Sequence, residues 1–324
     1  MYTLDELQEM VGTAIQALPN DRVPRGLYAP IDYVLSLGGK RIRPILVLMA
    51  YNLYRDDVQK AMMPAIGLET YHNFTLLHDD LMDRADVRRG MPTVHKKWND
   101  NTAILSGDNM LVMAMQRVVS CDAQHMPSVV NLFTKTAIEI DEGQQYDMEF
   151  ETRNDVTEEE YIEMIRLKTS VLLACALKMG ALLADASEED QESLYGFGEK
   201  LGLAFQLQDD YLDVYGDYKT FGKKIGGDIL CNKKTYMLIN ALLMANEQQH
   251  KALQRWVDAV DPDPEEKIKA VTALYDEIGI PALAQKRIEC YFEEAMQCLN
   301  RVSVNEEVKS ALRELAQRLM HRQS

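Results

Sequence analysis

Apolar residues recur at intervals of three and four along this 324-residue chain. Near its start they are Leu4, Leu7, Val11, Ile15 and Leu18, and near its end Val308, Leu312, Leu315 and Leu319. This spacing places the apolar side chains on one face of an α-helix. Only 17 glycines and 10 prolines interrupt the chain, and the period-two alternation typical of strands is hard to find. The sequence therefore predicts an all-α protein.

The periodicity predicts helices over residues 3–18, 29–37, 41–54, 58–83, 101–118, 127–149, 157–184, 188–214, 234–246, 264–276, 281–299 and 305–321. Thr157 and Ser187 are predicted N-caps, because each precedes a run of acids that favours the positive end of a helix. The segment Asp261–Pro264 is a predicted turn before another helix. No linker rich in Gly, Ser or Pro divides the chain, so residues 1–324 are expected to form one domain, a single large helical bundle.

The overall charge of the chain bears on the kind of partner that it can bind. There are 35 Lys and Arg against 51 Asp and Glu, a formal net charge of −16, which argues against a nucleic-acid partner. The five cysteines form no C-x-x-C pair, so a disulfide framework or zinc site is not expected. We expect a reducing, cytoplasmic location instead. The N-terminus lacks the basic start of a signal peptide. No apolar run approaches the roughly 20 residues of a membrane span, so stable membrane insertion is not expected.

The pattern Asp-Asp-x-x-Asp occurs twice, behind an apolar helical run each time, at Asp79, Asp80 and Asp83 and at Asp209, Asp210 and Asp213. In a helix, the first and last aspartates of each motif lie at i and i+4 on one face. Like charges at this spacing destabilise a helix, most of all near its negative C-terminal end. A cation would compensate, and Mg²⁺ prefers carboxylate, water and phosphate oxygens. One such motif is ordinarily a solvated acidic helix end, but two copies indicate a metal site.

Basic residues cluster near both acidic motifs despite the acidic total. They are Lys40, Arg41 and Arg43 before a helix, Arg88 and Arg89 after the first motif, and Lys223, Lys224, Lys233 and Lys234 after the second. Mg²⁺ with Arg and Lys around one cleft can hold a diphosphate and stabilise it as a leaving group. A single basic pair is ordinarily a surface feature, but the repeated order of acids and then bases favours a diphosphate site.

The segments GGKRIRP, LLHDDLMDRADVRRGMPTVH, KTS, FQLQDDYLD and GKKIGGD…NKKT together resemble the trans-isoprenyl diphosphate synthases, or polyprenyl synthetases. The resemblance runs in order from about residue 38 to residue 236. It implies the all-α isoprenoid synthase fold with a central active-site cavity, a homodimer and about three Mg²⁺ ions per active site. The implied reaction condenses isopentenyl diphosphate with an allylic diphosphate, which is dimethylallyl, geranyl or farnesyl diphosphate.

The resemblance also implies roles for individual residues. The metal ligands would be Asp79, Asp80, Asp83, Asp209, Asp210 and Asp213, of which Asp79, Asp83 and Asp209 are also expected to be catalytic. The isopentenyl diphosphate site would contain Lys40, Arg43, His72 and Arg89. The allylic diphosphate would be held by Arg88, Lys168, Lys223 and Lys233. Lys168, Thr169 and Gln206 are expected near the reacting carbons as catalytic residues, with Lys168 and Gln206 also binding substrate.

Product length depends on the residues that precede the first motif. The growing tail is expected to run back along this helix, past residues one and two turns before Asp79. Tyr71 and Phe74 share a face there, and in related enzymes large residues at such positions stop elongation. Because Thr75 is small, the sequence predicts farnesyl or geranylgeranyl diphosphate as the product and leaves these two open.

Three other functions are compatible with parts of this pattern. Terpene cyclases also ionise diphosphates with Asp motifs and Mg²⁺, but they lack a second diphosphate site, which GGKRIRP and Arg89 indicate here. An inactive subunit of a heteromeric synthase would be expected to have lost aspartates, and both motifs are intact. A longer-chain polyprenyl diphosphate synthase is the alternative product class.

Overall fold

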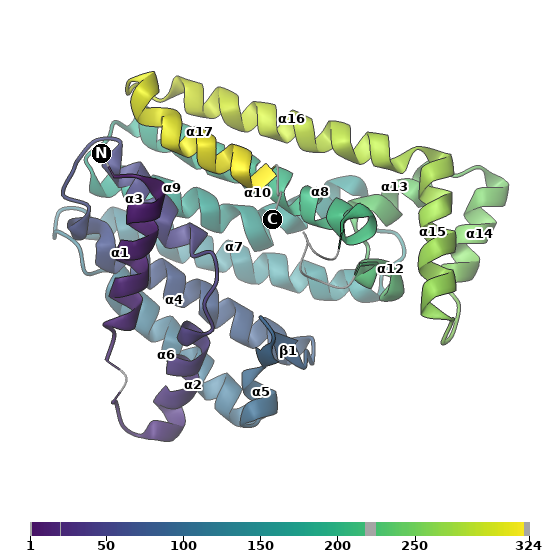
Figure 1. Cartoon of the computed structure of the whole chain (residues 1–324), viewed down its shortest axis with the longest axis horizontal. Coiled ribbons are helices and arrows are strands. Elements are labelled where there is room, and N and C mark those ends of the chain that lie inside the picture. Colours follow the sequence, from purple (N-terminus) through teal and green to yellow (C-terminus); the bar gives the residue numbers. More distant parts are fainter. Residues whose placement is uncertain (1, 20, 218–224, 321–324) are drawn as a thin grey trace. The chain divides into compact units, whose positions relative to one another are not determined.

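The computed structural model describes residues 2–19, 21–217 and 225–320. The first part of the chain forms α1 (Leu4–Gln16), α2 (Arg25–Ser36), α3 (Ile42–Asn52), α4 (Gln59–Met82), β1 (Val87–Arg88), β2 (Met91–Pro92), α5 (Val94–Lys97), α6 (Asp100–Val118) and α7 (Met126–Thr152). The rest forms α8 (Glu158–Ile165), a π-helical segment η1 (Arg166–Ser170), α9 (Val171–Leu183), α10 (Glu188–Tyr215), α12 (Gly227–Leu230), α13 (Tyr236–Met244), α14 (Glu247–Val257), α15 (Pro264–Ile278), α16 (Ile280–Arg301) and α17 (Glu306–Met320). The all-α prediction is confirmed (Figure 1).

The chain divides into two compact units. Unit 1 comprises Met1–Lys135, Cys175–Leu194 and Ser303–Ala311, and unit 2 comprises Thr136–Ala174, Tyr195–Val302 and Leu312–Ser324. The first aspartate-rich motif therefore belongs to unit 1 and the second to unit 2. That the whole chain is one domain around a central cavity stays a prediction.

In unit 1, the helix that ends in the first motif is fixed by close packing against α6 (Figure 1). A Cβ added to Gly67 of α4 would come within 2.7 Å of the Val118 side chain and 2.8 Å of its backbone nitrogen. Only glycine permits this approach of the two backbones. Behind them, α3 is buried on all sides from Pro44 to Asn52, which is typical of a core helix.

A two-residue hairpin connection in unit 1 departs from the expectation of helices alone. Val87 pairs with Pro92 and Arg88 with Met91 in an antiparallel ladder. The connecting residues Arg89 and Gly90 have φ of 53° and 75°, the positive values that a tight hairpin turn of this kind requires. Arg-Gly is not the usual Asn-Gly signal, so the sequence pattern gave no warning of this turn.

The predicted helix over 157–184 is interrupted at residues that belong to unit 2. Thr157 forms the predicted N-cap, and its side chain accepts from the backbone N–H of Glu160 in a capping box. The chain then passes through the π-helical segment η1 before α9 begins at Val171. The extra residue of a π-turn changes which side chains face α7, and such segments are frequent at functional sites.

Most other helices match their predicted ranges to within a few residues, and three of the described helices were missed: the one-turn helices α5 and α12, and α14. The longest of the three, α14, buries only Leu253, so its apolar stripe is too thin to detect. All five cysteines are free. Within the described residues, every helix is too short or too polar to cross a membrane.

Candidate active site

The first motif lies where α4 ends. Asp79 and Asp80 occupy the last turn of α4 and Asp83 is its C-cap residue, donating its backbone N–H to the Asp79 carbonyl at 2.9 Å. The side chain of Asp79 is partly exposed and that of Asp83 is exposed, so both carboxylates reach solvent. These positions match the predicted i, i+4 arrangement.

Asp80 points elsewhere and pairs with the hairpin. Its carboxylate accepts from Arg88 Nε at 2.8 Å and from Arg88 Nη2 at 2.7 Å, while Arg88 Nη2 lies 3.6 Å from Asp79. Burial raises the pKa of Asp80, against the opposing effect of Arg88. The fork-like guanidinium thus ties β1 to the end of α4. The prediction that Asp80 also binds metal stays a prediction.

The hairpin turn directs Arg89 to the glycine turn before α3. Arg89 Nη1 donates to the Gly38 carbonyl. Gly38 and Gly39 have φ of 75° and 125°, and a Cβ on Gly39 would lie 2.9 Å from Arg89 Cζ. Gly39 therefore makes room for the guanidinium, whereas at Gly38 the positive φ is what favours glycine. Lys40 follows them in the same turn and is exposed.

Arg43 and His72 form the inner part of this basic cluster. Arg43 Nη1 lies 3.0 Å from His72 Nε2. A guanidinium can only donate, so Nε2 accepts and the proton of a neutral His72 is on Nδ1. Burial, together with Arg43 and Arg89, holds the pKa of His72 well below its usual value, and burial lowers the pKa of Arg43 to about 10.

One hydrogen-bond donor of this basic cluster has no acceptor. Arg43 Nε is buried without a hydrogen-bond partner, and among the described residues no carboxylate pairs with Arg43. A half-buried cation that lacks an acid, with its Nε buried and unused, is unfavourable by itself and suits an anionic ligand. The structure thus brings together Arg43, His72 and Arg89, as the resemblance implied.

In unit 2, the π-helical segment carries Lys168 and Thr169. Lys168 Nζ donates to Asp147 Oδ2 of α7 at 2.6 Å. Burial raises the pKa of Asp147, but Lys233 and Lys168 more than offset it and the pKa is lowered. Gly143 permits this approach, because a Cβ there would lie 2.8 Å from Lys168 Cα.

The second motif lies at the end of α10 and is linked to the same segment. Thr169 Oγ1 donates to Gln206 Oε1 at 3.4 Å, and Gln206 Nε2 donates to Asp210 Oδ1 at 3.3 Å. Asp210 is 5% exposed and also accepts from the Tyr161 hydroxyl. Burial raises the pKa of Asp210 to about 7. Asp209 beside it is partly exposed.

Asp213, the last aspartate of the second motif, holds the chain at Asp228. Its Oδ2 accepts from the backbone N–H of Asp228 at 2.9 Å, and the Asp228 carbonyl accepts from the Lys233 N–H at 2.9 Å. Lys267, only 2% exposed, donates to Asn232 Oδ1 at 2.7 Å and so supports the residue before Lys233. The predicted substrate ligand Lys223 lies outside the described residues, as does Lys224.

The carboxylates of both motifs fit a hard divalent ion. Their donors are all oxygens, and Mg²⁺ usually takes one or two protein carboxylates and completes its shell with water and phosphate. No three His, Cys, Asp or Glu side chains converge on one point within the described part of the chain. Ions shared between one or two carboxylates and a diphosphate need no tighter cluster.

The predicted chain-length residues occupy two environments. Tyr71 is 1% exposed, and its ring packs edge-on against Phe133 at 5.2 Å. Phe74 is half-buried, with its ring 5.5 Å from Tyr71 and 4.8 Å from His78. Thr75 Oγ1 donates to the His72 carbonyl at 2.8 Å. Phe74 is therefore the more accessible aromatic ring, and their roles in product length stay predictions.

Sequence reasoning missed three partners of the predicted residues: Glu69, Asp147 and Tyr161. Glu69 is an acid within the long apolar stretch of α4, which was a detectable signal. Asp147 lies 21 residues from Lys168, and Tyr161 lies 49 residues from Asp210. Only the packing of separate helices brings those pairs together.

Comparison with known proteins agrees with this arrangement. The family model described as Polyprenyl synthetase matches residues 24–275. A short chain isoprenyl diphosphate synthase of Methanocaldococcus jannaschii is 43% identical over 70% of this chain and 69% of its own length. A geranylgeranyl diphosphate synthase of Methanosarcina mazei is 42% identical over 74% of this chain and 76% of its own.

Solved structures agree as well. One described as a geranylgeranyl pyrophosphate synthase is 43% identical, with a TM-score of 0.95 and full coverage of both chains. A geranylgeranyl pyrophosphate synthase from Corynebacterium glutamicum, complexed with isoprenyl diphosphate and magnesium, is 28% identical, with a TM-score of 0.83 over 99% of this chain and 97% of that chain. This chain, with its two aspartate-rich motifs, therefore belongs to the polyprenyl synthetase family of prenyltransferases.

Proposed function

We propose that the protein condenses isopentenyl diphosphate with allylic diphosphates and releases geranylgeranyl diphosphate. Membership of the family supports short-chain trans-prenyl transfer. The observation that carries the proposal is the basic cluster of Arg43, Arg89 and His72, which is separate from the Arg88–Asp80 pair. An enzyme that joins two diphosphates needs a cationic site for each, whereas a terpene cyclase needs only one.

In this proposal the two substrates are held by different residues. Isopentenyl diphosphate binds Lys40, Arg43, His72 and Arg89, with the unused Arg43 Nε facing an anion. The allylic diphosphate binds Arg88, Lys168, Lys223 and Lys233. Thr169 and Gln206 orient the reacting carbons, since Thr169 donates to Gln206 and Gln206 donates to Asp210.

The metal ligands are the aspartates of both motifs. Asp79, Asp83 and Asp209 are the more exposed donors, while Asp80, Asp210 and Asp213 also anchor their surroundings. Bound Mg²⁺, about three ions per site, would neutralise the charge of the departing diphosphate. Arg88 is held in place by Asp80 and adds a fixed positive charge to the same diphosphate.

The reaction then follows from positioning and charge. The bond from C1 of the allylic substrate to oxygen breaks, and its electron pair leaves with the diphosphate. The double bond of isopentenyl diphosphate attacks C1, and the adduct loses a proton, for which the released diphosphate is a suitable acceptor. No side chain needs a finely tuned pKa, but the cation must be shielded from water.

Geranylgeranyl diphosphate is favoured over farnesyl diphosphate by the relatives and by the position of Phe74. Similar proteins that are named for a product include a geranylgeranyl diphosphate synthase at 42% identity. Phe74 is half-buried five residues before Asp79, where its ring would limit the growing tail, and the smaller Thr75 at the next position would not.

The test supplies isopentenyl diphosphate with dimethylallyl, geranyl or farnesyl diphosphate, each with Mg²⁺, and sizes the products by mass spectrometry. We expect a product of four isoprene units from all three primers. Accumulation of a shorter or a longer product would contradict the assigned length. Cyclic hydrocarbons made from a primer alone would contradict the reaction.

A homodimer in the cytoplasm completes the proposal. Along α6, Ile104, Leu105 and Val112 are 46%, 61% and 66% exposed, and Leu105 and Val112 lie seven residues apart on one face. An apolar stripe of this kind suits an isologous interface. Sedimentation should give a dimer for the parent protein and a monomer for the Leu105→Glu, Val112→Glu variant.

A further inference from the structure

The segment of residues 38–43, which runs from the glycine turn into the start of α3, is called the turn of residues 38–43 below. It carries more positive charge than the binding of isopentenyl diphosphate alone explains. Arg41 lies between Lys40 and Arg43, and Arg89 reaches the same turn from the hairpin. Cations this close repel one another when no anion is bound. The turn therefore needs a partner that holds it in place before substrate arrives.

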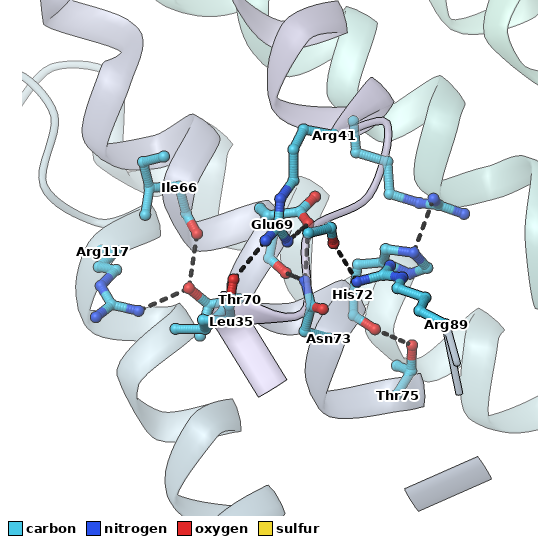
Figure 2. Close-up of polar contacts among 12 residues, drawn as sticks. Leu35, Arg41, Ile66, Glu69, Thr70, His72, Asn73, Thr75, Arg89 and Arg117 are labelled. Atoms are coloured by element: carbon cyan, nitrogen blue, oxygen red, sulfur yellow. Dashed lines mark hydrogen bonds and ion pairs between the residues drawn. The ribbon is translucent and has the colours of Figure 1, made fainter. Parts of the chain in front are cut away.

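That partner is Glu69, which the proposed chemistry leaves unused. Its side chain is on α4 and the residue is only 2% exposed. Glu69 Oε1 accepts from Arg41 Nη1 at 2.6 Å and from Asn73 Nδ2 at 2.8 Å (Figure 2). A buried carboxylate with two donors on one oxygen is strongly held in one orientation.

Arg41 extends this contact to two further elements. Its Nη2 donates to the carbonyl of Leu35 near the end of α2. Arg41 is also the residue from which α3 begins, with a φ of 49° that few residues adopt without support. One guanidinium thus joins α2, the start of α3 and Glu69 of α4 (Figure 2).

The position of the diphosphate-binding cations follows from that junction. Arg43 is two residues beyond Arg41, in the first turn of α3, and Arg89 binds the carbonyl of Gly38 three residues before it. The Glu69 carboxylate also raises the pKa of Arg43 and of Arg89, opposing the larger effect of burial on both. Loss of the Glu69 charge would therefore displace the turn and increase the repulsion within it.

We propose that Glu69 is a positioning residue for isopentenyl diphosphate, acting through Arg41 to hold the turn of residues 38–43. Glu69 touches no substrate itself. This inference rests on the proposed function, because it names what supports the isopentenyl diphosphate site of that reaction.

The test compares the two substrates in Glu69→Gln, which keeps the shape of the side chain and removes its charge. The KM for isopentenyl diphosphate should rise about tenfold or more, as expected when one partner of a buried charge pair is removed. The KM for the allylic primer and kcat should stay within about twofold of the parent values. Calorimetry with isopentenyl diphosphate alone, which does not react without a primer, should show a matching loss of affinity.

Two further variants test the route through Arg41. Arg41→Lys keeps the charge but cannot bridge Glu69 and Leu35 with two arms, so it should raise the same KM. The double variant should have a KM for isopentenyl diphosphate no higher than that of the more affected single variant, because both changes remove the same contact between Arg41 and Glu69. Glu9→Gln makes the same chemical change at an exposed position of α1 and should leave both KM values unchanged.

Equal increases in both KM values, or a lower melting temperature with unchanged KM values, would show that Glu69 is merely structural and overturn the proposal. If Glu69→Gln does not fold, Glu69→Asp and Arg41→Lys give the same readout. A parent protein that forms no product from isopentenyl diphosphate would refute the proposed function. An active parent with unaffected variants would refute only the role of Glu69.

Discussion

The carboxylates of Asp79 and Asp209 are the side chains on which the proposed reaction depends most directly. With Mg²⁺ present, Asp79→Ala and Asp209→Ala should each lower kcat by about 100-fold to 1,000-fold or more, since each removes charge stabilisation of the leaving group. Without ligand, the melting temperature should be equal or slightly higher, because a repulsive i, i+4 pair is lost. Asp5→Ala, at an exposed position of α1, is the matched control. Full activity of either variant at saturating Mg²⁺ would refute the metal assignment.

His72 makes a separate prediction about stability and pH. Its pKa is lowered in the folded protein, so the unfolded chain takes up a proton first as the pH falls. Folding stability should therefore decrease below about pH 6.5, by up to about 1.4 kcal/mol per pH unit for this group. Urea unfolding of ligand-free protein between pH 7.5 and pH 5 should show a smaller decrease for His72→Gln. His250→Gln of α14 is the matched control and should follow the parent. If the free energy of unfolding falls with pH equally in His72→Gln and the parent, the prediction is wrong.

How far the residues could be predicted depends on how local their signals are. Asp79 and Asp83 form a motif along one helix, so their shared face follows from the sequence alone. Asp147 and Glu69 escaped prediction because their roles come from contacts with distant residues. Motifs identify groups that meet a ligand, whereas the residues that hold those groups are found only through tertiary packing.

At the scale of elements, periodicity predicted the long helices well and the irregular segments poorly. The ends of α4 and α10 were predicted to within one residue, because apolar stripes and acidic ends mark them. The hairpin at Arg89-Gly90 and the π-helical segment were missed. The helical period of apolar residues carries no information on a single inserted residue or on a two-residue turn. In this chain the π-helical segment and the hairpin each carry proposed substrate ligands.

The glycine turn before α3 can be tested as an element. Gly39→Ala should destabilise the fold by about 1–3 kcal/mol, because φ is 125° at this residue, and should raise the KM for isopentenyl diphosphate by pushing on Arg89. Gly12→Ala is the matched control, since nothing lies within 4 Å of the new Cβ and it sits inside α1. There, alanine should stabilise the helix by about 0.5–1 kcal/mol. Unchanged stability and KM in Gly39→Ala would show that the turn adapts.

At the scale of the whole molecule, the measurable output is the length of the product. The family resemblance implied the reaction but left farnesyl and geranylgeranyl diphosphate open, since product length depends on the space left between packed side chains. In unit 1, Phe74 packs beside a cluster that includes Leu77 of α4 and Met110 and Met113 of α6. Two methionines adapt to different shapes more readily than branched residues do. The rigid aromatic ring is therefore the expected stop, with the methionines shaping the space around it.

Substitution of the two aromatic residues tests this stop. Phe74→Ala should release products longer than the parent product, because each added isoprene unit can bury five carbons at roughly 0.8 kcal/mol per methylene-sized group. Tyr71 is fully buried against Phe133, so Tyr71→Ala should lower stability by about 3–5 kcal/mol without changing product length. The double variant should make the longest products, since Tyr71 becomes the next barrier only after Phe74 is gone. Mass spectrometry of all three product mixtures decides. If the double variant keeps the parent length at full activity, the stop lies elsewhere, and the assignment to geranylgeranyl diphosphate rests on the relatives alone.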